Sequence, residues 1–285
     1  MGPGFRYHLV TLVAVFLALG LGMVIGMSYV QGPVLERLTR HQEQLNVTFT
    51  NEIAPLREQV ARYHSFVAAV TPTLVSERLA GKRVALVQTG DYANAATLVR
   101  EALEAAGATV MRTTVVEPTY AAAVQLRAAE LVPKLQAAHP SLPDGPDAVS
   151  RILAVSAARG GPRSDLEALR DARLARTDGD YTRRADLVIL VGGATNEDRE
   201  RVQAVDLPLI RHLRELGART LFVEPMAAAF SYIGAIAGQG IATVDNVDTD
   251  IGRIAVVLAA DAEPGDYGAK PTASAGLLPR ATPTQ

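Results

Sequence analysis

A pair of glycines follows the cleanest strand pattern in the sequence, residues 186–191, and marks a candidate ligand site. In α/β folds, the loop between a strand and the next helix points its backbone amides outward, and such amides bind anions. This candidate loop consists of Gly192, Gly193, Thr195 and Asn196. It lacks both glycine-rich fingerprints of nucleotide sites. The alternative is a plain strand-to-helix turn in which Asn196 caps the helix.

Other residue types that carry chemistry are sparse. Asp245, Asp248 and Asp250 are clustered, as in a hard-cation site, but they lack the glycine and glutamate of an EF-hand loop and fit helix capping equally well. The five histidines have no metal-binding spacing, and Met23 and Met27 fit apolar packing. The sequence has no cysteine and no G-x-S-x-G motif. We therefore predict a non-enzymatic protein with no evident cofactor.

Composition limits the class of protein. A chain of 285 residues accommodates one sizeable domain plus extra elements, and only 5% of the residues are aromatic, so its core is aliphatic. The net charge is −2, with both signs spread along the chain. Because nucleic-acid binders need a basic surface to neutralise phosphates, we expect no nucleic-acid partner.

Residues 9–30 contain no charged side chain and are long enough to cross a bilayer. As a helix, they extend roughly 33 Å, against a hydrocarbon core of about 30 Å. The alternative, a cleaved signal peptide, has a shorter apolar run and a small-residue cleavage site. We therefore predict an uncleaved single-pass anchor in the lipid bilayer of the cell membrane. Because Arg6 lies in a short basic tail, we expect the N-terminus in the cytoplasm and the larger part outside.

Small residues recur at four-residue spacing within this span: Ala14, Ala18, Gly22 and Gly26. At this spacing they lie on one helix face, where two helices can approach closely in lipid. We interpret them as a helix–helix association face, although alanine and glycine are also common in spans that do not associate.

A heptad pattern follows the span and predicts a coiled-coil stalk over residues 33–71, after a break at Gly32–Pro33. The predicted core residues are Leu35, Leu38, Leu45, Phe49, Leu56, Tyr63 and Phe66. Polar Gln42, Glu52 and Gln59 occupy the other core positions, and Pro55 should interrupt the helix near 52–55. We favour a parallel homodimer through anchor and stalk over a helix that packs on its own domain.

The remaining sequence alternates strand and helix patterns. The predicted strands are Arg83–Gln88, Thr109–Val116, 186–191, Thr220–Val223 and 241–244, and the predicted helices are 92–106, 121–139, 148–158, 197–216 and 250–260. Gly107 follows the first helix, where a C-cap glycine is expected. This alternation predicts an α/β domain with a doubly wound, mostly parallel sheet. The predicted divisions are 1–32 (cytoplasmic tip and anchor), 33–71 (stalk), 72–262 (domain) and 263–285 (extended tail).

Three stretches resemble the mycobacterial copper transport protein B (MctB) family: residues 5–26 (FRYHLVTLVAVFLALGLGMVIG), 88–92 (QTGDY) and 266–279 (DYGAKPTASAGLLP). The resemblance covers nearly the full length. It implies copper homeostasis or transport and an envelope location, the outer envelope included; copper itself is implied only by this resemblance. Because one span cannot enclose a pore, we expect a dimer rather than a self-contained channel. The alternatives are an envelope scaffold that binds a protein partner, or a small-molecule or anion receptor.

Overall fold

The computed structural model describes the backbone of residues 3–280 and the side chains of residues 7–27, 44 and 47–280. The chain divides into two compact units, Met1–Ser65 and Phe66–Gln285, and each is described by itself.

The first unit is helical. Helix α1 (Pro3–Thr48) continues through the predicted break at Gly32–Pro33. The break is absent because a proline removes a single N–H bond, which a helix of 46 residues tolerates. Within α1, Tyr7–Met27 is long and apolar enough to cross a membrane, with a mean hydropathy of 2.6. This confirms the predicted N-terminal apolar helix.

A π-helical turn, η1 (Phe49–Ile53), separates α1 from α2 (Ala54–Val75). Pro55 is the second residue of α2 and has no N–H, so the carbonyl group of Asn51 lacks its regular helical donor. A π turn rearranges the hydrogen bonds at such a point. The interruption predicted near 52–55 is therefore confirmed.

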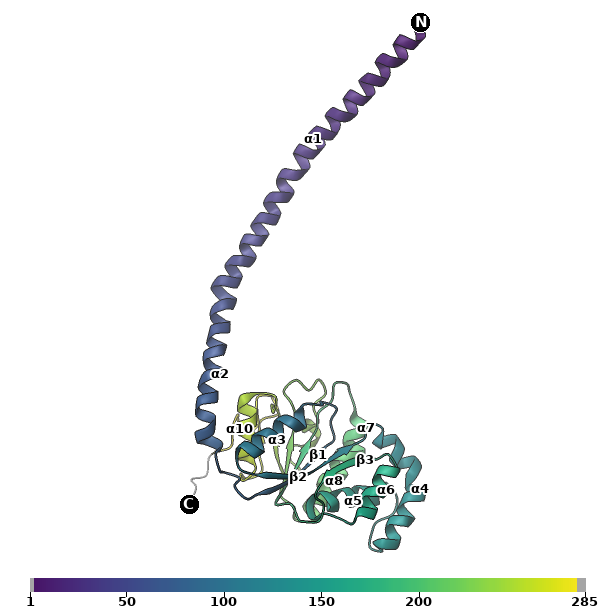
Figure 1. Ribbon diagram of the computed structural model, residues 1–285, viewed down its shortest axis with the longest axis vertical. Helices are drawn as coiled ribbons and strands as arrows, with labels where there is room; N and C mark the ends of the chain where they lie inside the picture. Colours follow the sequence, from purple (N-terminus) through teal and green to yellow (C-terminus); the bar gives the residue numbers. More distant parts are fainter. Residues whose placement is uncertain (1–2, 281–285) are drawn as a thin grey trace. The chain divides into compact units, whose positions relative to one another are not determined.

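The second unit, in which Figure 1 labels β1, β2 and β3, contains a seven-stranded sheet. The order of its strands is β3-β2-β1-β4-β5-β6-β7. The strands are β1 (Arg83–Gln88), β2 (Thr109–Val116), β3 (Ala175–Gly179), β4 (Leu187–Val191), β5 (Thr220–Val223), β6 (Ala242–Val244) and β7 (Asp266–Tyr267). Only β3, which pairs with β2, is antiparallel. The predicted α/β class with a mostly parallel sheet is confirmed.

Helices pack on both faces of this sheet. They are α3 (Ala95–Ala105), α4 (Tyr120–Ala138), α5 (Pro146–Arg159), α6 (Arg163–Asp171), α7 (Arg199–Arg201), the π segment η2 (Val202–Asp206), α8 (Leu207–Glu215), α9 (Ile233–Ile236) and α10 (Asp250–Ala259). Alternate residues of β1 face opposite sides: Val87 packs with α4, α5 and α8, and Leu86 packs with α3 and α10. Two hydrophobic cores therefore enclose the sheet.

Four elements lie in segments without a predicted strand or helix: α6, β3, α9 and β7. The edge strand β3 has the sequence ARTDG, and the short helix α6 precedes it. The predicted tail also takes part in the fold, because β7 pairs with β6. After β7 the chain turns back, with Ala275 donating to the carbonyl of Asp266 and Gly268 to that of Gly276.

Candidate functional site

The order of strands reverses between β1 and β4. The chain runs from β1 outward to β2, whereas β4 lies on the other side of β1. Open α/β sheets bind ligands at the carboxyl ends of the two strands that flank such a switch point. The QTGDY segment, 88–92, begins with the last residue of β1, and the predicted glycine loop begins directly after β4. The structure thus brings these two sequence motifs together.

Backbone contacts close the crevice between these two loops. The amides of Thr89 and Gly90 donate to the carbonyl of Val191, at 2.8 and 3.0 Å, and the amide of Asp91 donates to that of Gly193 at 3.2 Å. A Cβ atom at Gly90 would collide with the backbone of the glycine pair. Glycine at position 90 is therefore required by this close approach.

The amide expected to bind an anion already has a carboxylate partner. Asp91 accepts hydrogen bonds from the Thr195 amide (3.0 Å) and from the Thr195 hydroxyl (2.7 Å), and Asn196 donates to the same hydroxyl at 3.3 Å. The following helix starts at Arg199, and its cap is the Asp198 side chain, which accepts from the amide of Arg201. The alternative prediction that Asn196 caps this helix is wrong. An external anion at the loop would have to displace Asp91.

A buried carboxyl group, Asp206, contacts the same loop from the π segment η2. It is fully buried, and its Oδ1 accepts a hydrogen bond of 2.6 Å from the Thr89 hydroxyl. Among the described residues, its Oδ2 has no hydrogen-bond partner. Burial raises the pKa of Asp206 to about 7, although the Thr89 bond and the charge of Arg201 act in the opposite direction. π turns are frequent at functional sites.

Arg201 supplies a buried positive charge to this region. Its side chain is 5% exposed. The guanidinium donates to the carbonyl of Thr89 and to the carbonyls of Val116, Glu117 and Pro118 after β2, the latter three at 2.8–3.1 Å. It therefore joins the ends of β1 and β2. The sequence analysis missed both Arg201 and Asp206, because a charged residue in a helical pattern is ordinarily exposed.

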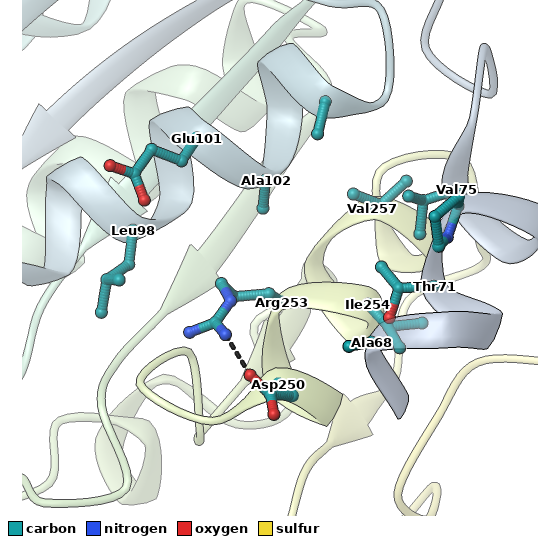
Figure 2. A pocket seen from close by; sticks show the side chains of 12 residues that line it. Ala68, Thr71, Val75, Leu98, Glu101, Ala102, Asp250, Arg253, Ile254 and Val257 are labelled. Carbon is teal, nitrogen blue, oxygen red and sulfur yellow. Dashed lines mark hydrogen bonds and ion pairs between the residues drawn. The ribbon is translucent and has the colours of Figure 1, made fainter. Parts of the chain in front are cut away.

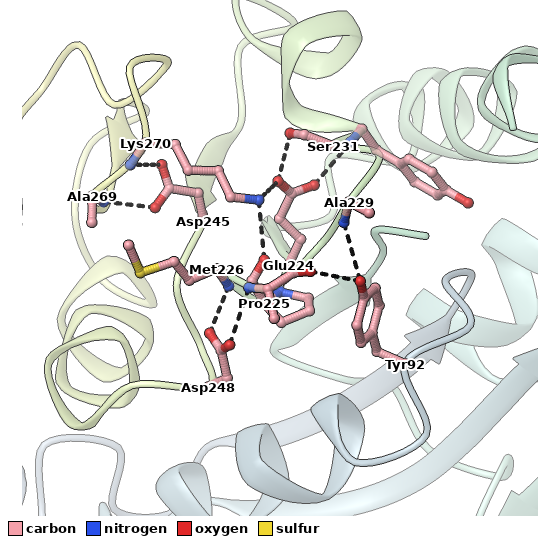
Figure 3. A network of polar contacts seen from close by, with 12 residues as sticks. Tyr92, Glu224, Pro225, Met226, Ala229, Ser231, Asp245, Asp248, Ala269 and Lys270 are labelled. Atoms are coloured by element: carbon pink, nitrogen blue, oxygen red, sulfur yellow. Dashed lines mark hydrogen bonds and ion pairs between the residues drawn. The ribbon is translucent and has the colours of Figure 1, made fainter. Parts of the chain in front are cut away.

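A second polar cluster lies at the ends of β5 and β6 (Figure 3). Glu224 is completely buried and accepts hydrogen bonds from the Ser231 hydroxyl (2.5 Å), the Tyr232 amide (2.9 Å) and the Lys270 ammonium (2.6 Å). Lys270 also donates to the carbonyl of Pro225 at 3.0 Å, and its side chain is 15% exposed. Lys270, in the C-terminal segment, thus neutralises the buried carboxylate of Glu224 at the carboxyl edge of the sheet.

Of the three aspartates grouped in the sequence, Asp245 and Asp248 accept hydrogen bonds from backbone amides, and Asp250 forms an ion pair with Arg253. Asp245 accepts from the amides of Ala269 and Lys270, at 2.7 and 2.9 Å. Asp248 accepts from those of Met226 and Ala227, at 2.6 and 3.1 Å. The cap of α10 is Thr249, whose hydroxyl accepts from the amide of Gly252. Within the residues described, no group of three or more histidine, aspartate or glutamate side chains is placed to hold a metal ion.

Tyr92 connects the two clusters. Its hydroxyl donates to the carbonyl of Ala227 at 2.6 Å and accepts from the amide of Ala229 at 3.1 Å. The carboxyl edge of the sheet is consequently one continuous network from the loop after β1 to the segment after β7. Met226, between these contacts, has a side chain that is 49% exposed.

Comparison with known proteins gives a match over almost the whole chain. Residues 4–278 match the family described as "Copper transport outer membrane protein, MctB". The chain belongs to the MctB family. Two similar relatives, each named "Copper transporter MctB", come from Mycobacterium tuberculosis and Mycobacterium bovis. Each is 28% identical over 286 residues, which cover 89% of this chain and 90% of the relative.

Two of the stretches that resemble the MctB family meet at the edge just described. The first, 88–92, supplies Tyr92, and the second, 266–279, supplies Lys270. Both side chains hold the segment after β5, through Ala227 and Pro225 respectively. Two stretches that lie far apart in the sequence therefore stabilise one loop system.

A separate groove of about 410 Å³ lies between the end of α2, α3 and α10 (Figure 2). Its walls are mostly apolar, with Thr71, Ala102 and Ile254 contributed by the three helices in turn. Asp250 and Arg253 form an ion pair at its margin. None of the residues that line this groove belongs to the three MctB-like stretches.

The residues of the predicted anchor and stalk lie in the first unit, except Phe66, which begins the second. Ala14, Ala18, Gly22 and Gly26 are exposed on α1, and a Cβ atom at either glycine would meet nothing within 4 Å. Among the predicted stalk residues, the exposed ones are Phe49, Leu56, Tyr63 and Phe66. Leu35, Leu38 and Leu45 lie outside the described side chains.

Proposed function

We propose that this protein is a single-span envelope protein that serves copper transport or homeostasis. The observation that carries the proposal is the family match over residues 4–278, which includes both the apolar helix and the α/β domain. The named relatives support it because the similarity covers 90% of their length. The proposal concerns the role of the whole protein and assigns no copper ligand.

The proposed arrangement places the N-terminus in the cytoplasm and the α/β domain outside the cell membrane. Arg6 and the short tail before the apolar helix favour this orientation. The outer envelope is the alternative location, because the family's description refers to an outer membrane. Separation of inner and outer membranes followed by immunoblotting distinguishes the two.

The protein acts as a dimer in this proposal, through the small-residue face of the anchor and a coiled-coil stalk, and each copy carries a doubly wound domain. One helix cannot enclose a transport path, so a second copy or a membrane partner is needed. The exposed apolar residues of η1 and α2 support an association of this kind.

Deletion of the gene and complementation test the copper role. We expect the deletion strain to stop growing at several-fold lower copper concentrations and to contain more cell-associated copper. The full chain should restore both, and a chain that lacks residues 1–32 should not. Tolerance to zinc and nickel is the control. Unchanged copper tolerance and copper content in the deletion strain would contradict the proposal.

An envelope scaffold is the second candidate. The observation that favours it is the closed carboxyl edge of the sheet, where Asp91 occupies the Thr195 amide and Lys270 neutralises Glu224. In this case, affinity purification of the full chain from cross-linked membranes should yield one protein partner in stoichiometric amount. Copper tolerance should not depend on the gene.

A further inference from the structure

A ridge of exposed apolar side chains runs along the part of the first unit that follows the apolar span. It consists of Phe49, Ile53, Leu56, Val60 and Tyr63, whose exposed fractions lie between 39% and 60%. Their spacing is four, three, four and three residues. This alternation is the heptad spacing that aligns core residues along one face of a coiled-coil helix. We call these five residues the stalk seam.

The stalk seam differs from the core of an unbroken heptad pattern. Continuing the predicted pattern from Leu45 places Glu52 and Gln59 in the core, and both side chains are polar and exposed. The stalk seam instead has Ile53 and Val60, one residue later in each case. At both of these core positions, the stalk seam therefore has an apolar residue where the unbroken heptad pattern has a polar one.

The π turn η1 accounts for this one-residue shift. In sequence, Leu45, Phe49 and Ile53 are separated by two successive steps of four. Each step turns an α-helix about 40° beyond a full turn, so two of them would move the seam around the helix. A π turn contains one more residue than an α-helical turn, which offsets much of this drift. Because η1 covers Phe49–Ile53, the extra residue lies at the point of the shift.

We propose that the stalk seam is the interface with a second copy of this chain, in parallel and in register, and that the π turn sets its phase. This inference rests on the dimer of the proposed function and specifies its contact. Two copies anchored by the same apolar helix in one membrane have the same direction, so their seams align residue by residue. Self-complementary heptads associate in this manner.

The charges beside the seam fit a parallel pair. Glu52 directly precedes the seam residue Ile53, and Arg57 directly follows Leu56. In a parallel coiled coil, these two flanking positions face each other across the interface. Glu52 of one chain therefore lies opposite Arg57 of the other, and the symmetry gives two such pairs. The intrachain pair of Glu58 and Arg62, at 2.7 Å, is exposed and occupies the outer positions.

The seam for a second copy ends at Tyr63. The next residue in the alternation, Val67, is 4% exposed and belongs to the core of the second unit. Val75 of the same helix is buried in that core as well. The helix α2 thus has two roles: its residues before Phe66 carry the stalk seam, and Val67 and Val75 belong to the core of the second unit.

Cysteine cross-linking in membranes tests the proposal, because the chain has no cysteine of its own. Single substitutions are made in the full chain: Ile53→Cys and Val60→Cys on the seam, Glu52→Cys and Gln59→Cys beside it, and Glu58→Cys on the outer face. With diamide as oxidant, we expect disulfide-linked dimers at positions 53 and 60, several-fold less dimer at 52 and 59, and none at 58.

The charge pair is tested in the Val60→Cys background. Arg57→Glu should reduce the dimer several-fold, and Glu52→Arg together with Arg57→Glu should restore it. More dimer at 52 and 59 than at 53 and 60 would overturn the register and the role of the π turn. No dimer at any position would overturn the second copy as partner. Copper tolerance of the same strains is measured separately, so failure of the dimer is distinguishable from failure of the copper role.

Discussion

At the scale of single residues, most polar side chains of the candidate site form hydrogen bonds or ion pairs with other groups of the same site. The sequence predicted the position of Gly192–Gly193 correctly, since a buried strand followed by glycines indicates a loop at the sheet edge. It did not predict that the Asp91 carboxylate accepts a hydrogen bond from the Thr195 amide, because these two residues are 104 positions apart in the chain. Likewise, Asp206 and Arg201 were not recognisable as buried, since the π segment that turns Asp206 inward has no sequence signature.

The first prediction concerns the pH dependence of stability. The pKa of Asp206 is about 7 in the folded protein and near 3.8 when unfolded, so between these values the folded state binds the extra proton. Raising the pH from 5 to 8 should therefore lower the free energy of unfolding by about 3 kcal/mol. Asp206→Asn should remove most of this dependence. Thermal unfolding of the detergent-solubilised chain at several pH values measures it.

The exposed Asp178→Asn variant is the matched control and should follow the unsubstituted protein. Asp186, whose pKa the Arg83 side chain lowers to about 2, affects stability only below about pH 4, outside this window. Identical pH dependence in the Asp206→Asn variant and the unsubstituted protein would contradict the assignment.

At the scale of elements, the buried parallel strands were predictable and the edges were not. β1, β2 and β5 begin and end at the predicted residues, because apolar runs bounded by turns specify strands covered on both faces. Gly107 ends α3 as predicted, with a positive φ of 85° and the Ala108 amide donating to the carbonyl of Leu103. By contrast, β3 consists mostly of polar residues, so it has no apolar strand pattern. β7 has two residues, followed by a reversal of the chain, and is too short for a recognisable pattern.

The second prediction concerns the docking of the segment after β7. Lys270→Met leaves the buried carboxylate of Glu224 without its positive partner, which should destabilise the domain by about 3 kcal/mol. The expected fall in Tm is roughly 6–12 °C. Limited proteolysis should cleave after residue 263 sooner than in the unsubstituted protein.

Lys82→Met is the control, because Lys82 is about half exposed and lies 3.8 Å from Asp261, an arrangement worth less than about 1 kcal/mol. Combining Lys270→Met with Glu224→Gln should recover part of the lost stability, since no buried charge then remains unpaired. A Tm for Lys270→Met equal to that of the control would show that the ion pair does not hold this segment.

At the scale of the whole molecule, an apolar helix precedes an α/β domain in the chain. Composition alone established the helix, and the alternation of strands and helices established the class of domain. The π turn before Pro55 was not predictable, because a heptad template assumes an unbroken α-helix of fixed period. A single-span protein of this type depends on its orientation for any envelope role.

The third prediction therefore concerns the side of the membrane on which the domain lies. Leu126 of α4 is 82% exposed, so Leu126→Cys provides a unique, accessible thiol in a chain without cysteine. We expect a membrane-impermeant maleimide to label it in intact cells, because a short basic tail before an apolar helix favours a cytoplasmic N-terminus. Gly4→Cys, before the apolar helix, should react only after the cells are permeabilised. The reverse pattern of labelling would place the domain in the cytoplasm, where it could not act on copper beyond the membrane.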